Sequence, residues 1–199
     1  MATQEKVIGI LGGLGPEATV DLYGKILAAT AARTDQEHLH VLIDSNPKVP
    51  DRNKAIAGTG EPATPALIAM ARRLEAAGAD FLVIACNTAH AFAAEIGSAV
   101  RIPLVSQIEE TVDAVRRRMP GIRRVGVLAG QGCVDAGIYQ RAFAQRGIEM
   151  LLPPGAGQRQ LMELIYRIKA GDTGTETRAA VRALGVGLFD AGAELVVAG

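Results

Sequence analysis

Residues 77–90 read AGADFLVIACNTAH, and this stretch decides the fold. Its middle part, DFLVIA at 80–85, is a continuous apolar run, which is typical of a strand that is buried on both faces of a parallel sheet. The preceding segment, ALIAMARRLEAAGA at 66–79, has apolar residues at helical spacing. The following segment, 87–100, is also predicted to be helical. A buried strand between two helices indicates an α/β fold.

The alternation of strands and helices extends in both directions from this stretch. Apolar runs predict further strands, and apolar residues at helical spacing predict further helices. A long segment rich in proline, glycine and polar residues predicts a loop. The predicted strands are 6–11, 38–45 and 102–107, the helices are 17–33 and 108–119, and the loop is 46–65.

The pattern restarts in the second half of the chain. IGIL at 8–11 is matched by VGVL at 125–128, which lies 117 residues later. AGADFLVIA at 77–85 is matched by AGAELVVAG at 191–199, which lies 114 residues later. Two similar offsets at two separate places indicate one duplicated βαβα unit.

The predicted fold class is therefore α/β, with two pseudo-symmetric lobes. Each lobe is a parallel sheet flanked by helices, the first spanning residues 1–115 and the second 116–199. Ligands of such sheets bind beyond the carboxyl ends of the strands. Two related lobes would present their strand-end loops to one shared cleft, where we expect the active site.

The composition excludes several classes of partner. The chain of 199 residues has 21 basic and 21 acidic residues, a balance that does not favour a nucleic-acid partner. No apolar run approaches the roughly 20 residues that cross a bilayer, so no membrane association is expected. The start, MATQEKVIGI, lacks the apolar run of a secretory signal. The two cysteines show no disulfide framework, and we expect a reduced, cytoplasmic protein.

Cys86 is the leading candidate for chemistry because it stands between a buried strand and a predicted helix. Free amides at a helix start stabilise an anion, which would favour the thiolate. Asn87 and Thr88 are predicted to cap that helix and to offer donors to a carboxylate. An isolated cysteine in such a place is usually a small buried apolar residue. The repeat favours a functional role for Cys86, because the equivalent position of the second repeat falls just past Gly199.

Two thiols at related strand ends suit racemisation or epimerisation. One base removes a proton from a tetrahedral carbon, and the other delivers a proton to the opposite face. This reaction requires no cofactor, and none is predicted. The sequence contains neither a P-loop lysine motif nor a cluster of metal ligands, so no metal site is predicted.

Five segments together resemble the aspartate racemase branch of the aspartate/glutamate racemase superfamily. They are IGILGGLGPEATVDLY, DSNPKVPDR, GADFLVIACNTAH, IPLVSQIEET and VGVLAGQGCVDAGIYQ. The resemblance implies an isomerase that works without pyridoxal phosphate, with two cysteines as acid and base. It also implies a homodimer and an acidic amino acid as substrate, aspartate or glutamate. The second cysteine of the family lies in a GCTE segment that would begin here at Gly199, so the chain is expected to end before it.

The resemblance implies roles for further residues. Arg52 would pair with one substrate carboxylate and Lys169 with the other, while Cys86 would be one acid/base. The remaining substrate-binding residues would be Pro50, Asp51, Asn87, Thr88 and Ala89, and the cleft would also include Gly13, Asn46, His90, Gln131 and Cys133.

Several of these residues also have simpler interpretations. Cys133 aligns with Pro16 in the repeat rather than with Cys86, so we interpret it as a small loop or core residue. His90 would either polarise the surroundings of the thiol or be a half-buried helix residue. Lys169 is, from the sequence alone, typical of a surface residue near a helix C-terminus.

Three other functions remain open. The first is dinucleotide binding, because GLGPEA at 13–18 fits the G-x-G-x-x-[GA] pattern, although Pro16 removes one N–H group. The second is a binding protein for a dicarboxylate or an amino acid that lacks two-base activity. The third is another reaction of the superfamily, such as that of hydantoin racemases, maleate isomerases or arylmalonate decarboxylases.

Overall fold

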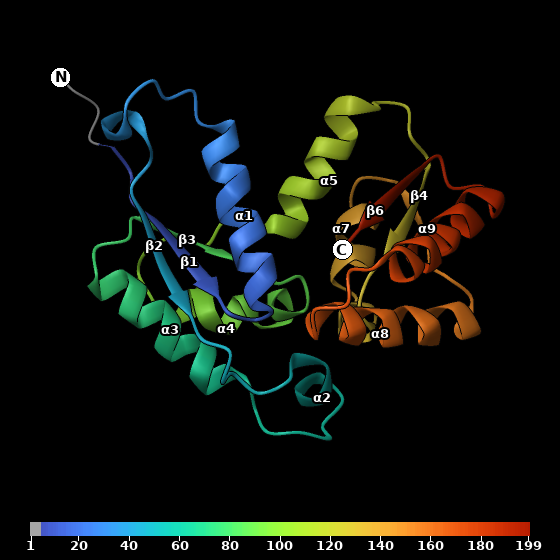
Figure 1. The fold of residues 1–199 in the computed structure, drawn as a ribbon, viewed down its shortest axis with the longest axis horizontal. Helices are drawn as coiled ribbons and strands as arrows, with labels where there is room; N and C mark the ends of the chain where they lie inside the picture. Colours follow the sequence, from blue (N-terminus) through green and yellow to red (C-terminus); the bar gives the residue numbers. More distant parts are fainter. Residues whose placement is uncertain (1–4) are drawn as a thin grey trace. The chain divides into compact units, whose positions relative to one another are not determined.

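The computed structural model describes residues 5–199, which divide into two compact units after Gln107 (Figure 1). The first unit contains β1 (Ile8–Gly12), α1 (Pro16–Ala29), a 3₁₀ turn η1 (Asp35–Glu37), β2 (Val41–Ser45), α2 (Arg52–Ile56), α3 (Thr64–Ala76), β3 (Phe81–Ile84), a second 3₁₀ segment η2 (Thr88–Phe92) and α4 (Ala93–Ser98). The second contains α5 (Gln107–Arg118), which begins at the boundary, then β4 (Arg124–Leu128), α6 (Gln131–Asp135), α7 (Ile138–Ala144), β5 (Glu149–Leu151), α8 (Gly155–Lys169), α9 (Thr175–Asp190) and β6 (Leu195–Ala198).

The first unit is built on a parallel sheet with the strand order β2-β1-β3. Alternate residues of the central strand face opposite sides of the sheet. Leu11 packs in a core that includes Leu67 and Met70 of α3. Ile10 packs in a second, smaller core that includes Leu22 of α1. Helices therefore flank both faces of this sheet.

The second unit repeats this arrangement with the strand order β5-β4-β6, again with every pair parallel. Val127 of β4 packs with Val112 of α5 and with Phe143 of α7. Leu128 packs in a separate core that includes Leu188 of α9. The prediction of an α/β chain with two parallel sheets flanked by helices is confirmed.

The duplication is visible at the glycine in the middle of each central strand. A Cβ added to Gly9 would lie 2.9 Å from the Cβ of Ala79, and one added to Gly126 would lie 3.2 Å from the Cβ of Ala193. These pairs are the ones that the repeat aligns. In each unit the turn after the long helix approaches the central strand so closely that only glycine fits there.

The last residues of β3 and β6 are anchored in the same way. The N–H of Ala85 donates to the carbonyl of Leu11 at 2.9 Å, and the N–H of Gly199 donates to the carbonyl of Leu128 at 2.8 Å. Ala85 and Gly199 are therefore structurally equivalent.

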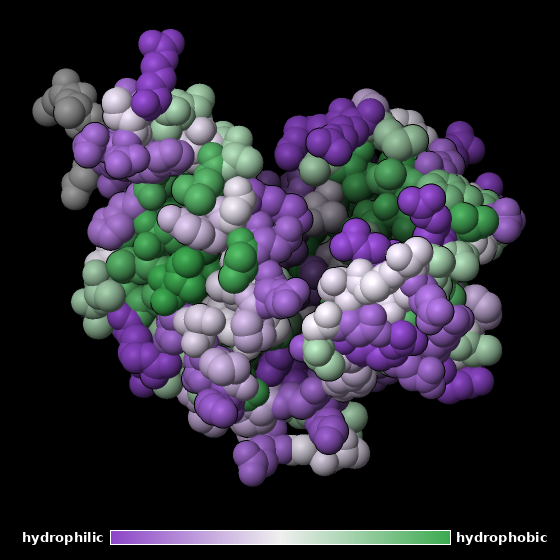
Figure 2. Space-filling view, in the orientation of Figure 1, coloured by the Kyte–Doolittle hydropathy of each residue, from purple (hydrophilic) through white to green (hydrophobic). Residues whose placement is uncertain are grey.

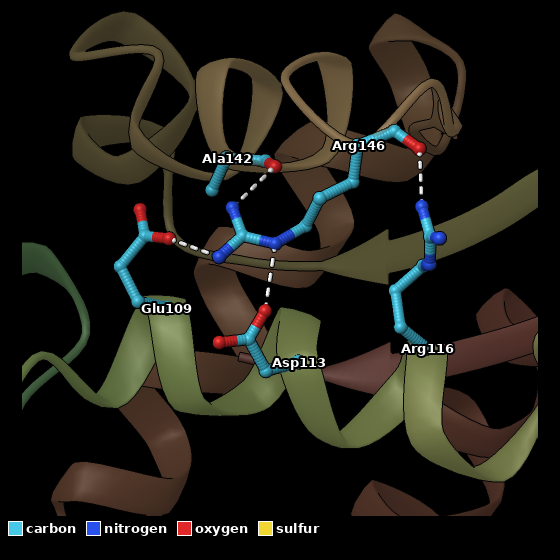
Figure 3. A network of polar contacts seen from close by, with 5 residues as sticks. All are labelled: Glu109, Asp113, Arg116, Ala142 and Arg146. Carbon is cyan, nitrogen blue, oxygen red and sulfur yellow. Dashed lines mark hydrogen bonds and ion pairs between the residues drawn. The ribbon is translucent and has the colours of Figure 1, made fainter.

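Helix α5 packs within the second unit, although the sequence placed the lobe boundary after residue 115. Ile108 and Val112 of this helix are buried in the core around β4. At the helix surface, Arg146 binds Glu109 at 2.7 Å and Asp113 at 2.8 Å, so that the turn after α7 is bound to α5 (Figure 3). These contacts explain why the compact units divide after Gln107.

Three segments differ from their predicted form. Residues 87–100, expected to be one helix, form η2 followed by the short α4. Residues 102–107, expected to be a strand, contribute a single bridge between Leu104 and Leu82, since Pro103 has no N–H to extend a ladder. The loop 46–65 contains the helix α2.

Candidate active site

Cys86 lies directly beyond the carboxyl end of β3. It is a half-buried free thiol, and it packs against the core of the first unit. The residue before it is held to β1 through the bond from Ala85 to Leu11, and its own carbonyl oxygen lies 2.9 Å from Nδ1 of His90. The backbone on both sides of the thiol is therefore fixed by bonds to different parts of the unit.

His90 is 5% exposed, and both of its ring nitrogens engage backbone groups. Nδ1 lies 2.9 Å from the carbonyl oxygen of Cys86, and Nε2 lies 3.2 Å from the backbone nitrogen of Gln107. Burial lowers the pKa of His90, against a smaller opposing effect of the carbonyls of Cys86 and Asn87. Burial therefore favours the neutral ring, and His90 is a buried residue that bonds to the backbone of Cys86.

The segment after Cys86 offers a weaker anion site than the sequence predicted. η2 has five residues, and Asn87, at φ −59° and ψ −50°, has helical angles instead of the extended backbone of a capping residue. Few aligned peptides contribute a small dipole, so the expected stabilisation of a thiolate by a long helix does not apply. Ala89 within this segment is fully buried.

Arg52 is the buried cation of the first unit's loops. Its side chain is 9% exposed, and Nη1 donates to the carbonyls of Val49 and Pro50, each at 3.0 Å. Nη2 donates to the carbonyl of Leu14 at 2.6 Å. The guanidinium thus joins the loop after β1 to the loop after β2. Asp51 accepts the N–H of Lys54 at 3.0 Å, and it thereby caps α2.

Gly13 and Asn46 lie on the same two loops. The N–H of Gly13 donates to Oγ1 of Thr19 at 2.8 Å, and the N–H of Asn46 donates to the carbonyl of Gly12 at 3.1 Å. Gly13 has φ +76°, and a Cβ on it would clash with the backbone of Asn46, so no side chain fits there. Because the carboxyl ends of parallel strands share one edge, these loops gather with Cys86 at that edge of the sheet.

One acidic residue near this edge has a structural role. Asp44, near the end of β2, accepts two bonds from Arg73 of α3, at 2.7 and 2.9 Å. The carboxylate is therefore neutralised by a neighbouring helix.

Thr88 begins η2 in the first unit, and the other remaining predicted residues lie in the second unit. Gln131 donates from Nε2 to Asp135 at 2.7 Å, in the helix that follows β4. Cys133 is 1% exposed, as expected of a core residue. Lys169 is the last residue of α8, and its Nζ lies 5.6 Å from the ring centre of Tyr166.

Two buried polar residues of the second unit were not singled out from the sequence. Gln158 donates to the carbonyl of Ala129 at 2.9 Å, just beyond β4. Tyr139 is 2% exposed, and its pKa is raised, first by burial and then by Cys133, while a hydrogen bond with Thr111 acts in the opposite direction. Both lie in segments with ordinary helical patterns, so no local signal marked them.

Neither a metal centre nor a membrane segment is found in the part of the chain that the structure describes. Across residues 5–199, no group of three or more His, Cys, Asp or Glu residues is arranged to hold a metal ion. Within the same residues, every helix is too short or too polar to cross a bilayer.

The sequence of this chain matches the profile of a known protein family. A profile described as Asp/Glu/hydantoin racemase matches residues 11–199, which is nearly the whole chain. The chain belongs to this family. The match begins in β1 and ends at Gly199, so it includes both units, and the resemblance noted from the sequence is confirmed.

Three relatives of this racemase-family chain have informative similarities. The Picrophilus torridus aspartate racemase structure is 29% identical, with a TM-score of 0.83 over 93% of this chain and 77% of that one. The structure of an aspartate racemase homologue from Pyrococcus horikoshii is 26% identical, with a TM-score of 0.75 over 98% and 84% of the two chains. A broad-specificity amino-acid racemase of Bacillus subtilis is 29% identical over 177 residues, covering 87% of this chain and 75% of the relative. Together with the family, they support a racemase activity.

Proposed function

We propose that this protein racemises an acidic amino acid without a cofactor, with aspartate as the first candidate and Cys86 as one acid/base. The observation that carries the proposal is that the Cys86 thiol and the buried Arg52 guanidinium belong to loops at one edge of the first sheet. The thiolate removes the α-proton, so that an S–H bond forms as the Cα–H bond breaks. The electron pair moves onto the carbon and its carboxylate, and a second thiol returns a proton on the opposite face.

Arg52 is suited to hold a substrate carboxylate. A guanidinium has five N–H donors, and three of them bind the carbonyls of Val49, Pro50 and Leu14. Among residues 5–199, the buried Nε of Arg52 has no hydrogen-bond partner. Nε and Nη2 form one edge of the plane, and such an edge binds a carboxylate through two parallel hydrogen bonds. A bound carboxylate would satisfy the unused donor and compensate the buried charge.

The duplication supports placing the second half of the reaction in the second unit. The position that follows Gly199 is equivalent to Cys86, because Gly199 and Ala85 make the same bond to their central strands. We propose that a cysteine at this position is the second acid/base, and that the exposed ammonium of Lys169 binds the second carboxylate. Asn87, Thr88 and Ala89 would bind the substrate beside Cys86.

The preference for aspartate rests on the relatives. An aspartate racemase is 29% identical to this chain, and so is a broad-specificity racemase. The substrate test therefore includes aspartate, glutamate and a neutral amino acid such as alanine. Activity on aspartate alone would support the acidic substrate class, whereas equal activity on alanine would contradict it.

The deciding experiment is the exchange of the α-proton of L- and D-aspartate in D₂O, followed by NMR. The chain is compared with a version extended past Gly199, and each is also tested as Cys86→Ser and Cys133→Ser. We expect both enantiomers to exchange and interconvert in the extended protein, and only Cys86→Ser to abolish exchange on its face. Aspartate binding without exchange in any version would favour the binding protein, and binding of NADH would favour the dinucleotide alternative.

We also propose that the protein is a cytoplasmic homodimer. In support, Figure 2 shows apolar side chains gathered over the β1–β2 side of the first unit. Val20, Tyr23 and Leu27 of α1 are spaced by about one and two helical turns, and 72% of Val20 is exposed. Light scattering should give a mass of two chains, and Val20→Glu should give one. A single-chain mass for the unchanged protein would contradict this proposal.

A further inference from the structure

Three features of the molecule have chemistry that the proposed reaction does not use: His90, the buried Tyr139, and the face of α8 and α9. Tyr139 lies next to Gly199, and an added Cβ there would be 3.1 Å from Cε2 of the ring. The α8–α9 face includes Ile168 and Val181, and it has no occupant that the structure identifies. His90 has the most complete set of contacts, and they fix its chemical form.

The hydrogen bonds of His90 determine which ring nitrogen carries the proton. A backbone N–H can only donate, so Nε2, which faces the N–H of Gln107 at 3.2 Å, must accept. A neutral imidazole has one donor and one acceptor nitrogen. Nδ1 therefore carries the hydrogen, and it donates to the carbonyl of Cys86 at 2.9 Å. A ring with 5% exposure has little room to exchange these partners with water.

This pair of bonds links the segment that carries the thiol to Gln107, the last residue of the first unit. Cys86 is held from the β1 side through Ala85, whose N–H donates to Leu11 at 2.9 Å. On the other side, the His90 ring binds the carbonyl of Cys86. The backbone N–H of His90 donates to the carbonyl of Asn87 at 3.0 Å. Cys86 lies between the end of β3 and the 3₁₀ segment η2, outside any helix or strand.

We propose that His90, as the neutral tautomer protonated at Nδ1, is a positioning residue that fixes the backbone of Cys86 and exchanges no proton with the substrate. The inference rests on the proposed function, since it assigns the positioned thiol to the α-proton of an amino acid. In this proposal His90 is not one of the two groups that act as acid and base. A reacting thiol that is misplaced by about 1 Å can lose about 100-fold in rate, which is why such a hold matters.

Two substitutions of His90 distinguish the effects of its two ring hydrogen bonds. His90→Asn can place an amide N–H near the position of Nδ1, so it retains the bond to Cys86 and loses the bond to Gln107. His90→Gln can place an amide oxygen near the position of Nε2, so it does the opposite. The same changes at His40, which is exposed, are the matched controls.

We expect His90→Gln to lower kcat for α-proton exchange by about 10-fold or more with little change in KM. His90→Asn should keep most of the kcat of the unchanged protein. Equal losses in both variants, or a loss confined to KM, would overturn the positioning role. The thermal midpoint of each variant, compared with its His40 control, identifies a loss of folding.

Two readouts do not depend on racemase activity. The ¹⁵N chemical shifts of the His90 ring should show a protonated Nδ1 and a bare Nε2 in the unchanged protein, and the opposite pattern would overturn the proposal. Alkylation of Cys86 by iodoacetamide, followed by peptide mass mapping, should be about threefold faster or more in His90→Gln and unchanged in His90→Asn. If no aspartate exchange is found but these two results hold, the proposed function fails and the positioning of Cys86 by His90 stands.

Discussion

The contacts of Arg52 lead to a prediction about stability as well as binding. Replacing it with Met removes the donors for three carbonyls, and the bonds to Val49 and Leu14 are buried. An unsatisfied buried acceptor costs about 1–3 kcal/mol, so two of them lower the free energy of unfolding by about 2–6 kcal/mol. Removal of a buried positive charge offsets part of this loss, which places the expected value in the lower half of the range.

The assay is urea denaturation followed by circular dichroism at pH 7. The control is Arg73→Met, which removes an ion pair with Asp44 from a side chain that is 55% exposed, and which should cost about 1 kcal/mol or less. Saturating aspartate should raise the midpoint of the unchanged protein but not that of Arg52→Lys, because a lysine offers no planar edge to a carboxylate. If Arg52→Met costs no more than Arg73→Met, the guanidinium does not hold the loops, and the reasoning is refuted.

Three further predictions concern the fold and its pH dependence. Gly9→Ala and Gly126→Ala should each cost about 1–3 kcal/mol by overpacking, and the double variant should show the sum because the two sites lie in separate cores. A strongly non-additive result in urea denaturation would contradict the separation of the two cores. Burial lowers the pKa of His90 below its ordinary 6.5, so the unfolded chain binds the proton more readily. The free energy of unfolding should therefore be highest above about pH 6.5 and decrease below it, and this decrease should be smaller in His90→Gln, as urea titrations at several pH values would show. Arg146→Met should lower the denaturation midpoint, more in low salt than in 1 M NaCl, while removal of the exposed Lys25 should have little effect.

The candidate site was only partly predictable from the sequence. The place of Cys86 after a strand follows from local pattern, because an apolar run that ends before polar residues marks the edge of a sheet. The environment of the thiol does not follow from it, since the predicted helix from 87 to 100 is broken into η2 and α4. Helix propensity is a weak prior that tertiary packing overrides, and Ala89 and Ile96 are both fully buried in this segment.

The sequence by itself determined the α/β alternation, the two repeats and the equivalence of Ala85 with Gly199. These follow from periodicity and spacing, which are properties of neighbouring residues. Only the tertiary structure decided that Arg52 binds the carbonyl of Leu14, 38 residues away, and that His90 accepts the N–H of Gln107, 17 residues away. The physical reason is that a buried polar group must find its partners wherever the fold brings a carbonyl or an N–H, and no local pattern encodes that meeting.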